Sequence, residues 1–359
     1  MLKQNAVQFA QTENGKRFLK TIGVLGALIL FVAVSTFVLN NVIATPVSPR
    51  EAQIRGWVDD LRDEALTRER QSAQEKLEAA GDEAVPALIG ALDADNATLR
   101  GNAAEMLGFI ASPRATDALA QTLRNDPSAA VRVNAANALG SIQAASAIPS
   151  LESSSVLDTS QQVRDASANA LQSIYARVAQ SANKNIDDVQ AITVAPNQAN
   201  VVYLATKRDL LVSRSGGAQW DTLTQTLPGL VATLDVNPTN AEILYAGLHS
   251  QGMYLSTDGG RTWQSLTRSF SNQAIGSSTV TAITVDPANA MRMVMAHGIR
   301  FGDSNATFVP LGILSSQGGG KTWKYVMDLD ASQAVTRLQV RDGKVYALTA
   351  DKVLITALP

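Results

Sequence analysis

The chain has 359 residues, with 30 Lys and Arg against 32 Asp and Glu and a formal net charge of −2. This length allows two or three domains with a substantial buried core, and the balanced charge excludes the basic footprint of a nucleic-acid-binding protein. The absence of cysteine excludes disulfides, thiol catalysis and cysteine-ligated zinc or iron–sulfur centres.

The first predicted element is an apolar segment at residues 21–44, which has no charged residue between Lys20 and Arg50. Such a run is long enough to cross a bilayer, and the basic tail at residues 1–20 favours a cytoplasmic N-terminus. The pattern predicts a single-pass membrane protein with the bulk of the chain periplasmic or extracellular. The alternative is a cleaved signal peptide ending at Ala44, although the apolar run exceeds the about 7 to 15 residues of such a segment.

A stalk or capping helix is expected over residues 48–80. Ser48, Pro49 and Glu51 combine an N-cap, a proline in the first turn and a capping-box glutamate. Apolar residues follow at helical spacing, with charged residues between them, which predicts a half-buried helix.

Residues 81–180 repeat themselves with a period of 32, since Arg100, Arg132 and Arg164 are equally spaced. Leu107, Leu139 and Leu171 show the same interval. Each unit reads as an antiparallel helix pair, and stacked pairs share a core that one pair alone cannot form.

This pattern resembles HEAT repeats, particularly the short form of phycobilin-lyase-like proteins. The resemblance implies an all-α solenoid whose partners are proteins. It does not transfer lyase activity, because the repeat supplies no catalytic group. We interpret the repeated arginine as a helix cap or a tie between repeats.

From about residue 186 to residue 359 the pattern changes to short β-branched runs separated by Gly, Pro, Asn and Asp. Three phrases recur, beginning at Ile192, Leu234 and Ile283, and each predicts a strand, a turn and a second strand. A fourth unit, Val335 to Ile355, contains the first three strands of the same pattern. The region is therefore expected to be all-β, with about four small sheets.

The sequence from Ser256 to Trp263 reads S-x-D-x-G-x-T-W, and two weaker copies end at Trp220 and Trp323. Glycines in such a turn take positive φ values, while Ser and Asp side chains accept hydrogen bonds from nearby amides. We therefore assign a structural role to seven residues: Ser256, Asp258, Gly260, Thr262, Trp263, Trp220 and Trp323.

These turns resemble the Asp-box of BNR-type β-propellers, a group that includes sialidases, sortilin-type receptors and assembly factors of photosystem II. The resemblance implies a partial or small propeller of about four blades, whereas such families generally close with six or more. A partner or a second copy of the chain is a candidate to complete it. The third unit carries an insertion, in which Arg300, Phe301 and Asp303 are candidate partner contacts.

An enzyme is not expected, and no catalytic, cofactor-binding or metal-binding residues are assigned. A sialidase requires an Arg cluster, a Tyr nucleophile with its Glu, and an acid Asp. The only glutamate after residue 185 is Glu242, which we interpret as a solvated turn residue. His249 and His297 lack the carboxylates that would complete a metal site.

The combined prediction is a membrane-anchored scaffold, or an assembly and stability subunit, that binds proteins of a multisubunit membrane complex. The alternative is a cell-surface or periplasmic receptor that binds glycan or peptide ligands through the propeller. A sialidase-like glycosidase is the least favoured interpretation.

Overall fold

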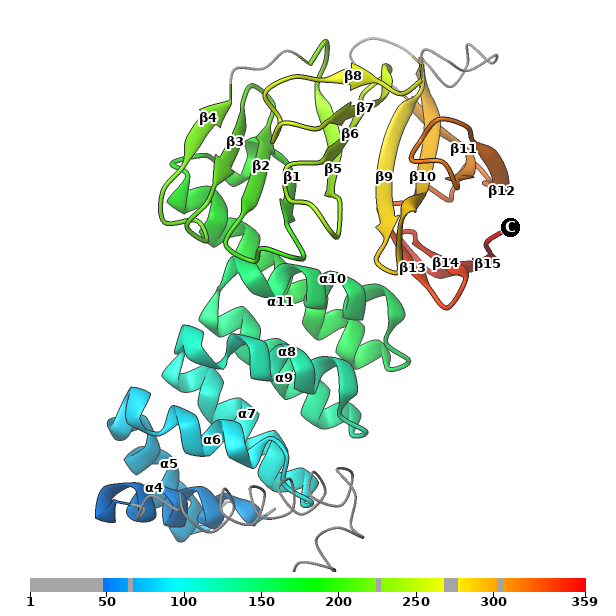
Figure 1. Ribbon diagram of the computed structural model, residues 1–359. Helices are drawn as coiled ribbons and strands as arrows, with labels where there is room; N and C mark the ends of the chain where they lie inside the picture. Colours follow the sequence, from blue (N-terminus) through cyan, green and yellow to red (C-terminus); the bar gives the residue numbers. More distant parts are fainter. Residues whose placement is uncertain (1–47, 64–66, 224–226, 268–276, 302–306) are drawn as a thin grey trace, which may run out of the picture. The chain divides into compact units, whose positions relative to one another are not determined.

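The structure is a computed structural model that describes residues 48–63, 67–223, 227–267, 277–301 and 307–359. The chain divides into two compact units, Met1–Arg55 and Gly56–Pro359. Helices precede strands along the chain (Figure 1). The described α-helices are α4 (Pro49–Asp59), α5 (Arg68–Ala80), α6 (Val85–Ala91), α7 (Ala97–Ile110), α8 (Thr116–Asn125), α9 (Ala129–Ile142), α10 (Ile148–Leu157) and α11 (Gln161–Ser181).

Local sequence accounts for where the repeat helices begin and end. The side chain of Asn96 caps α7 by accepting a hydrogen bond from the backbone N–H of Leu99 at 2.9 Å. Helices α7 and α9 both end at a residue with left-handed backbone, Ala111 and Gln143, which stand 32 positions apart. The repeat in sequence is thus a repeat in backbone geometry.

Small residues let the second helices of successive pairs approach closely. A Cβ atom at Gly108 of α7 would lie 2.9 Å from the Cα atom of Ala138 in α9. The next repeat shows the same relation, with 3.1 Å between a Cβ atom at Gly140 and the Cα atom of Ala170. Buried leucines such as Leu107 and Leu139 fill the space beside these contacts, so the pairs share one continuous core.

The predicted stalk is divided into two helices. Helix α4 is followed by a 3-10 turn at Asp60–Arg62, and α5 starts at Arg68, where Thr67 caps it through the backbone N–H of Arg70. The sequence did not predict the break between α4 and α5. The helical spacing of apolar residues continues through the segment in which the helical hydrogen bonding is interrupted.

The strands form four antiparallel sheets within the described residues, each built from consecutive strands. Sheet 1 contains β1 (Val189–Val194), β2 (Val202–Thr206), β3 (Leu210–Ser213) and β4 (Asp221–Leu223); sheet 2 contains β5 (Val231–Val236), β6 (Leu244–Leu248), β7 (Gly252–Ser256) and β8 (Gln264–Ser265). Sheet 3 contains β9 (Thr279–Asp286), β10 (Asn289–Phe301), β11 (Thr307–Ser316) and β12 (Lys324–Asp328); sheet 4 contains β13 (Arg337–Arg341), β14 (Lys344–Leu348) and β15 (Val353–Ala357).

The first strands of the four sheets lie beside one another, because β5 contacts β1 and β9, and β9 contacts β13. Helix α10 contacts both β1 and β13, the two ends of this series. Apolar side chains between neighbouring sheets form the core, with Tyr203 and Leu244 between sheets 1 and 2. A helical HEAT-like region followed by four small sheets is therefore confirmed as the fold class.

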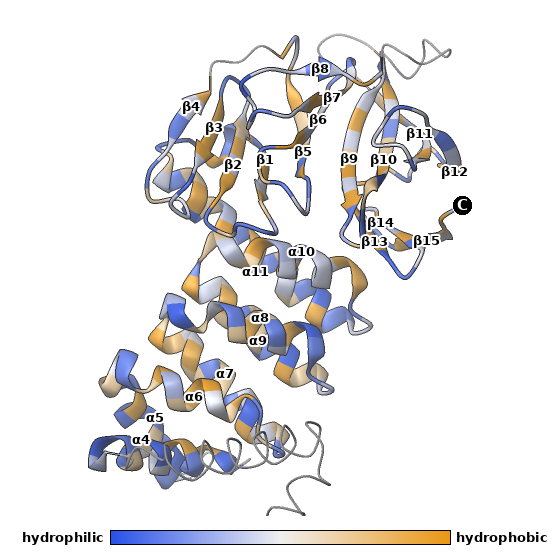
Figure 2. Ribbon diagram, in the orientation of Figure 1, coloured by the Kyte–Doolittle hydropathy of each residue, from blue (hydrophilic) through white to orange (hydrophobic). Residues whose placement is uncertain are grey.

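The predicted single-pass topology is corrected. Among the described residues, no helix has both the length and the apolar character needed to cross a membrane. The described helices alternate hydrophobic and hydrophilic residues along their length (Figure 2). The expected tail at residues 1–20 and the expected span at residues 21–44 lie outside the described residues. The predicted localisation as a single-pass membrane protein depended on such a helix and is corrected by this finding.

Candidate functional site

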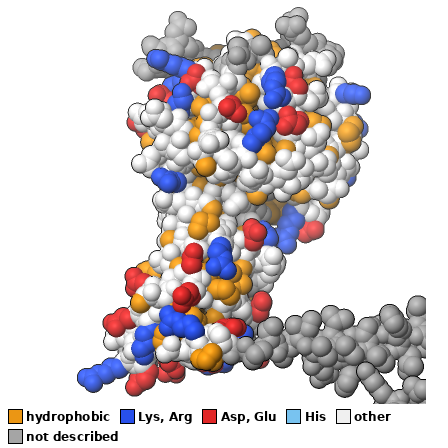
Figure 3. Space-filling view, turned by 60° about the vertical axis from the view of Figure 1, so that its left-hand side comes forward, with side chains coloured by type: hydrophobic (Ala, Val, Ile, Leu, Met, Phe, Trp, Pro, Cys, Tyr) orange, Lys and Arg blue, Asp and Glu red, His pale blue; other side chains and the backbone are white. Residues whose placement is uncertain are grey.

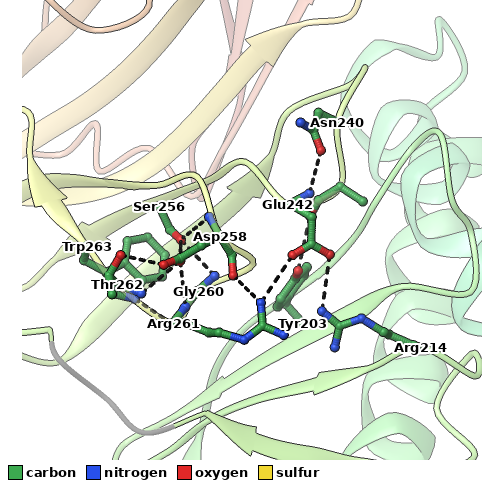
Figure 4. Close-up of polar contacts among 11 residues, drawn as sticks. Tyr203, Arg214, Asn240, Glu242, Ser256, Asp258, Gly260, Arg261, Thr262 and Trp263 are labelled. Atoms are coloured by element: carbon green, nitrogen blue, oxygen red, sulfur yellow. Dashed lines mark hydrogen bonds and ion pairs between the residues drawn. The ribbon is translucent and has the colours of Figure 1, made fainter.

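The turn after β7 is held by the side chains of two residues (Figure 4). The Ser256 hydroxyl accepts a hydrogen bond from the backbone N–H of Gly260 at 2.8 Å and donates to Asp258 Oδ1 at 2.8 Å. Asp258 also accepts from the backbone N–H of Thr262 at 2.9 Å and from its hydroxyl at 2.6 Å. The Trp263 indole donates to the carbonyl of Gly260 at 3.0 Å. Both carboxylate oxygens of Asp258 are therefore used to hold the turn.

These hydrogen bonds stabilise the ionised form of Asp258. The hydroxyl of Thr262 and then its backbone N–H lower the pKa of Asp258 to about 2. The side chain is therefore a fixed anionic acceptor of this turn at neutral pH.

The two weaker copies keep the serine and the tryptophan of the turn. Ser213 and Ser316 each accept a hydrogen bond at 2.9 Å from a backbone N–H, that of Gly217 and that of Gly320. The indoles of Trp220 and Trp323 donate to the carbonyls of the same glycines at 3.0 Å. In the first copy, Ser215 replaces the aspartate and accepts from Gln219 N–H at 2.8 Å. Ser and Trp thus maintain the turn without the carboxylate.

Glu242 connects the turns of sheets 1 and 2. One carboxylate oxygen lies 3.3 Å from Arg214 and the other lies 3.7 Å from Arg261, as Figure 4 shows. Its carbonyl accepts from the backbone N–H of Gly259 at 2.9 Å. Sequence reasoning treated this glutamate as solvated. It is half-exposed, but it also bridges two arginines from different turns.

The insertion in the third unit largely continues the strands. Residues up to Phe301 belong to β10, and β11 starts at Thr307, so the segment extends a hairpin. Arg300 and Phe301 are exposed, and 57% of the Phe301 surface is accessible. Asp303 lies outside the described residues.

The two histidines occupy different environments. His297 is buried on β10, with 3.4 Å between its Nε2 atom and the hydroxyl of Tyr325, while its Nδ1 atom has no hydrogen-bond partner among the described residues. Burial lowers the pKa of His297 to about 4. Burial, followed by the charge of Arg300, also lowers the pKa of His249. The described residues contain no group of three or more His, Cys, Asp or Glu placed to hold a metal ion.

Four ionisable residues line a cavity of about 210 Å³ beside the first strands: Glu152, Tyr175, Asp235 and Arg337. Sequence reasoning did not identify them, because they come from two helices and two sheets. One signal was present: Asp235 stands in the repeated phrase where Thr193 and Thr284 stand in the other copies.

Oppositely charged side chains are distributed over the surface without forming one large patch on the face in Figure 3. This distribution agrees with the small net charge of the chain. It favours contacts of mixed character over binding to a polyanion.

A family model described as HEAT repeats matches residues 54–128, 85–172 and 116–192. This match confirms the HEAT-like prediction for the helical region. No curated protein matches the chain.

Several solved structures are similar to parts of the chain. A GH74 xyloglucanase from Xanthomonas campestris is 18% identical over 47% of this chain and 28% of its own, with a TM-score of 0.36. The complex of CpcE and CpcF of phycocyanin lyase from Nostoc sp. is 24% identical over 37% of this chain and 91% of its own, with a TM-score of 0.31. An ancestral GH74 enzyme is 24% identical over 47% of this chain, with a TM-score of 0.40. This chain covers 22% to 28% of the GH74 enzymes.

Proposed function

We propose that this chain is a non-enzymatic scaffold that binds other proteins of a multisubunit complex. The observation that carries the proposal is the row of HEAT repeats from α6 to α11, whose stacked helix pairs leave an extended surface outside their shared core. Repeats of this kind present such surfaces to proteins, since each repeat contacts only its neighbours and its outer residues are free to vary.

The β region supports a binding role more than a catalytic one. Asp258 uses both oxygens within its own turn, and Glu242 lies between Arg214 and Arg261. A glycosidase needs two carboxyl groups facing one substrate, about 5 to 10 Å apart. Asp258 is therefore engaged by groups of its own turn and Glu242 by arginines of two turns, rather than the two being paired across a substrate.

The identity of the target complex is a finer part of the proposal. The Asp-box turns resemble those of assembly factors that act on membrane complexes, so subunits of such a complex are the partners we propose. This step rests on analogy of fold alone. It requires no membrane anchor in this chain.

The test is affinity purification of the tagged full chain from gently solubilised cells, with the recovered proteins identified by mass spectrometry. We expect stoichiometric recovery of the subunits of one complex. The matched variant is Phe109→Ser, which removes an exposed phenylalanine from α7 without touching the core, since 61% of that side chain is accessible. Recovery of the chain alone, under several solubilisation conditions, would contradict the scaffold.

A second candidate function is binding of glycan or peptide ligands. A groove of about 900 Å³ is lined by Tyr254, Trp263 and Leu266 of sheet 2 together with Lys321 of the third turn. Aromatic side chains in a groove suit flat apolar faces of sugars or peptides. Binding of an oligosaccharide or peptide library to the purified chain, lost in Tyr254→Ala, would favour this candidate over the scaffold.

A further inference from the structure

The cavity beside the first strands is lined at equivalent positions of the repeated β unit. Thr193, Asp235, Thr284 and Gln339 occupy the same place in the four copies and all border the cavity. Three of these side chains are neutral. Asp235 is therefore the one residue of the set that brings a charge into the cavity.

The backbone holds Asp235 in place. Its Oδ1 atom accepts a hydrogen bond from the backbone N–H of Val236 at 2.9 Å, and its Oδ2 atom accepts from Val285 on the neighbouring sheet at 2.8 Å. Both carboxylate oxygens are thereby held by backbone groups of sheets 2 and 3.

Helices α10 and α11 bring the other charged groups to the same cavity. Tyr175 donates to Glu152 Oε1 at 2.7 Å, and Arg337 of β13 donates to the Tyr175 hydroxyl at 3.3 Å. Arg337 also donates to the hydroxyl of Ser155 at 3.2 Å. These bonds join the last helix pair of the repeats to sheet 4.

The charges facing Asp235 are few and can all be named. Glu152 comes from α10, Tyr175 from α11 and Arg337 from β13, while the remaining residues that line the cavity are neutral. Burial raises the pKa of Glu152, while the charge of Arg337 and the hydrogen bond from Tyr175 oppose this rise. With Asp235 protonated and Glu152 ionised, the lining residues carry one carboxylate and one guanidinium, and the cavity is electrically balanced. With Asp235 ionised, the lining residues carry two carboxylates and one guanidinium, and this excess of negative charge is unfavourable away from bulk water.

We propose that this cluster is a proton-controlled contact between the helix pair α10–α11 and the β sheets. The contact is tight while Asp235 holds a proton, and it loosens as Asp235 ionises, because opening the cavity hydrates the surplus negative charge. A scaffold built this way changes how firmly its two binding regions are held together over a narrow range of pH.

The magnitude of the effect follows from the environment of Asp235. Burial raises the pKa of Asp235 to about 7, and the charge of Glu152 contributes in the same direction, while the backbone hydrogen bonds oppose it. The ordinary value is 3.8, so the folded state holds the proton where the unfolded chain has lost it. The contribution of Asp235 to the stability of the folded state is complete below pH 3.8 and is lost as the pH rises through about 7.

The experiment is amide hydrogen exchange of the full chain at pH 5.5 and pH 8.5, corrected for the intrinsic exchange rate at each pH. We expect peptides from α10, α11 and β13 to open about thirtyfold more often at pH 8.5, since pH 5.5 lies about 1.5 units below the pKa of about 7, above which the response levels off. Peptides from α7, a helix that does not line the cavity, report on local opening away from the cluster and are expected to change less.

The decisive variant is Asp235→Asn, which keeps the size of the side chain but cannot ionise. We expect its α10, α11 and β13 peptides to exchange at the same corrected rate at both pH values. The matched control is Asp221→Asn, which removes an exposed carboxylate of β4 and is expected to behave as the wild type. A pH response that survives in Asp235→Asn would overturn the proposal.

Two further variants cover misfolding and coupling. Asp235→Thr introduces the residue type that stands at the equivalent positions Thr193 and Thr284 of two other copies. It serves as the test if Asp235→Asn does not fold. Glu152→Gln removes the neighbouring negative charge, so the midpoint of the pH response is expected to move to lower pH. An unchanged midpoint would show that Glu152 and Asp235 do not interact and would contradict the cluster.

Discussion

At the scale of single residues, the Asp-box turns owe their geometry to groups that satisfy one another locally. Gly260 has a φ of 86°, a conformation that disfavours side chains. A Cβ atom there would also lie 3.0 Å from Leu223 and 3.7 Å from the ring of Trp263. The positive φ and the short distance to Leu223 therefore both favour glycine at this position.

We expect Trp263→Ala to destabilise the fold by about 3 kcal/mol. The ring is partly buried against the core between sheets 1 and 2 and donates to the Gly260 carbonyl. Loss of a large side chain leaves a cavity as well as a lost hydrogen bond. Denaturant unfolding measures the change. Gln264→Ala, an exposed neighbour, is the control, and equal stability of both variants would mean that the indole is not a packing residue.

At the scale of elements, buried ion pairs tie one helical repeat to the next. Arg100 forms a bidentate pair with Asp126, and Arg132 forms the same pair with Asp158 one repeat later. Each guanidinium also donates to backbone carbonyls before its own helix. The arginine periodicity predicted such ties. The partner aspartates, 26 residues further along the chain, were identified only from the packing of the helices in the structure.

Arg132→Ala is expected to lower the free energy of unfolding by about 1.5 to 3 kcal/mol, because it leaves the half-buried carboxylate of Asp158 without its charged hydrogen-bond partner. Burial by itself would raise the pKa of Asp158, but the hydrogen bonds from Arg132 and from the Ser160 N–H outweigh it and lower the pKa. Thermal or denaturant unfolding gives the measurement.

The control for this variant is Arg62→Ala, which breaks an exposed pair with Asp59. Exposed pairs contribute about 0 to 1 kcal/mol. A cost for Arg132→Ala no larger than that of Arg62→Ala would show that the repeat tie does not contribute to stability.

At the scale of the whole molecule, two buried groups oppose each other in the dependence of stability on pH. The lowered pKa of His297, about 4 against an ordinary 6.5, makes stability fall as the pH drops from 6.5 to about 4. The raised pKa of Asp235 makes stability fall as the pH rises from 3.8 to about 7. Over their shared window the two slopes largely cancel.

Replacing either group by a residue that cannot ionise should therefore leave the pH dependence of stability that the other group causes. We expect stability to fall with rising pH in His297→Leu and to rise with pH in Asp235→Asn, by about 1 kcal/mol per unit between pH 4.5 and 6.5. The slope of the wild type is expected to lie between those of the two variants. Denaturant unfolding across this range is the measurement, and slopes of the same sign in both variants would exclude the opposition.

The outcome of the sequence analysis differed between local and long-range features. The HEAT periodicity and the order of the strands were predicted, because helical spacing and strand alternation are properties of neighbouring residues. The break between α4 and α5 and the extended β10–β11 hairpin were not, since continuous patterns run through both. The localisation predicted from the apolar composition of residues 21–44 was wrong.

By itself, the sequence determined the classes of the two regions and the period of the repeats. These depend on contacts between residues close together in the chain. Tertiary structure decided which distant charges meet, as with Arg337 and Tyr175, which stand 162 positions apart. Their partners are chosen by how helices and sheets pack, and burial then sets the pKa of Asp235 and of His297.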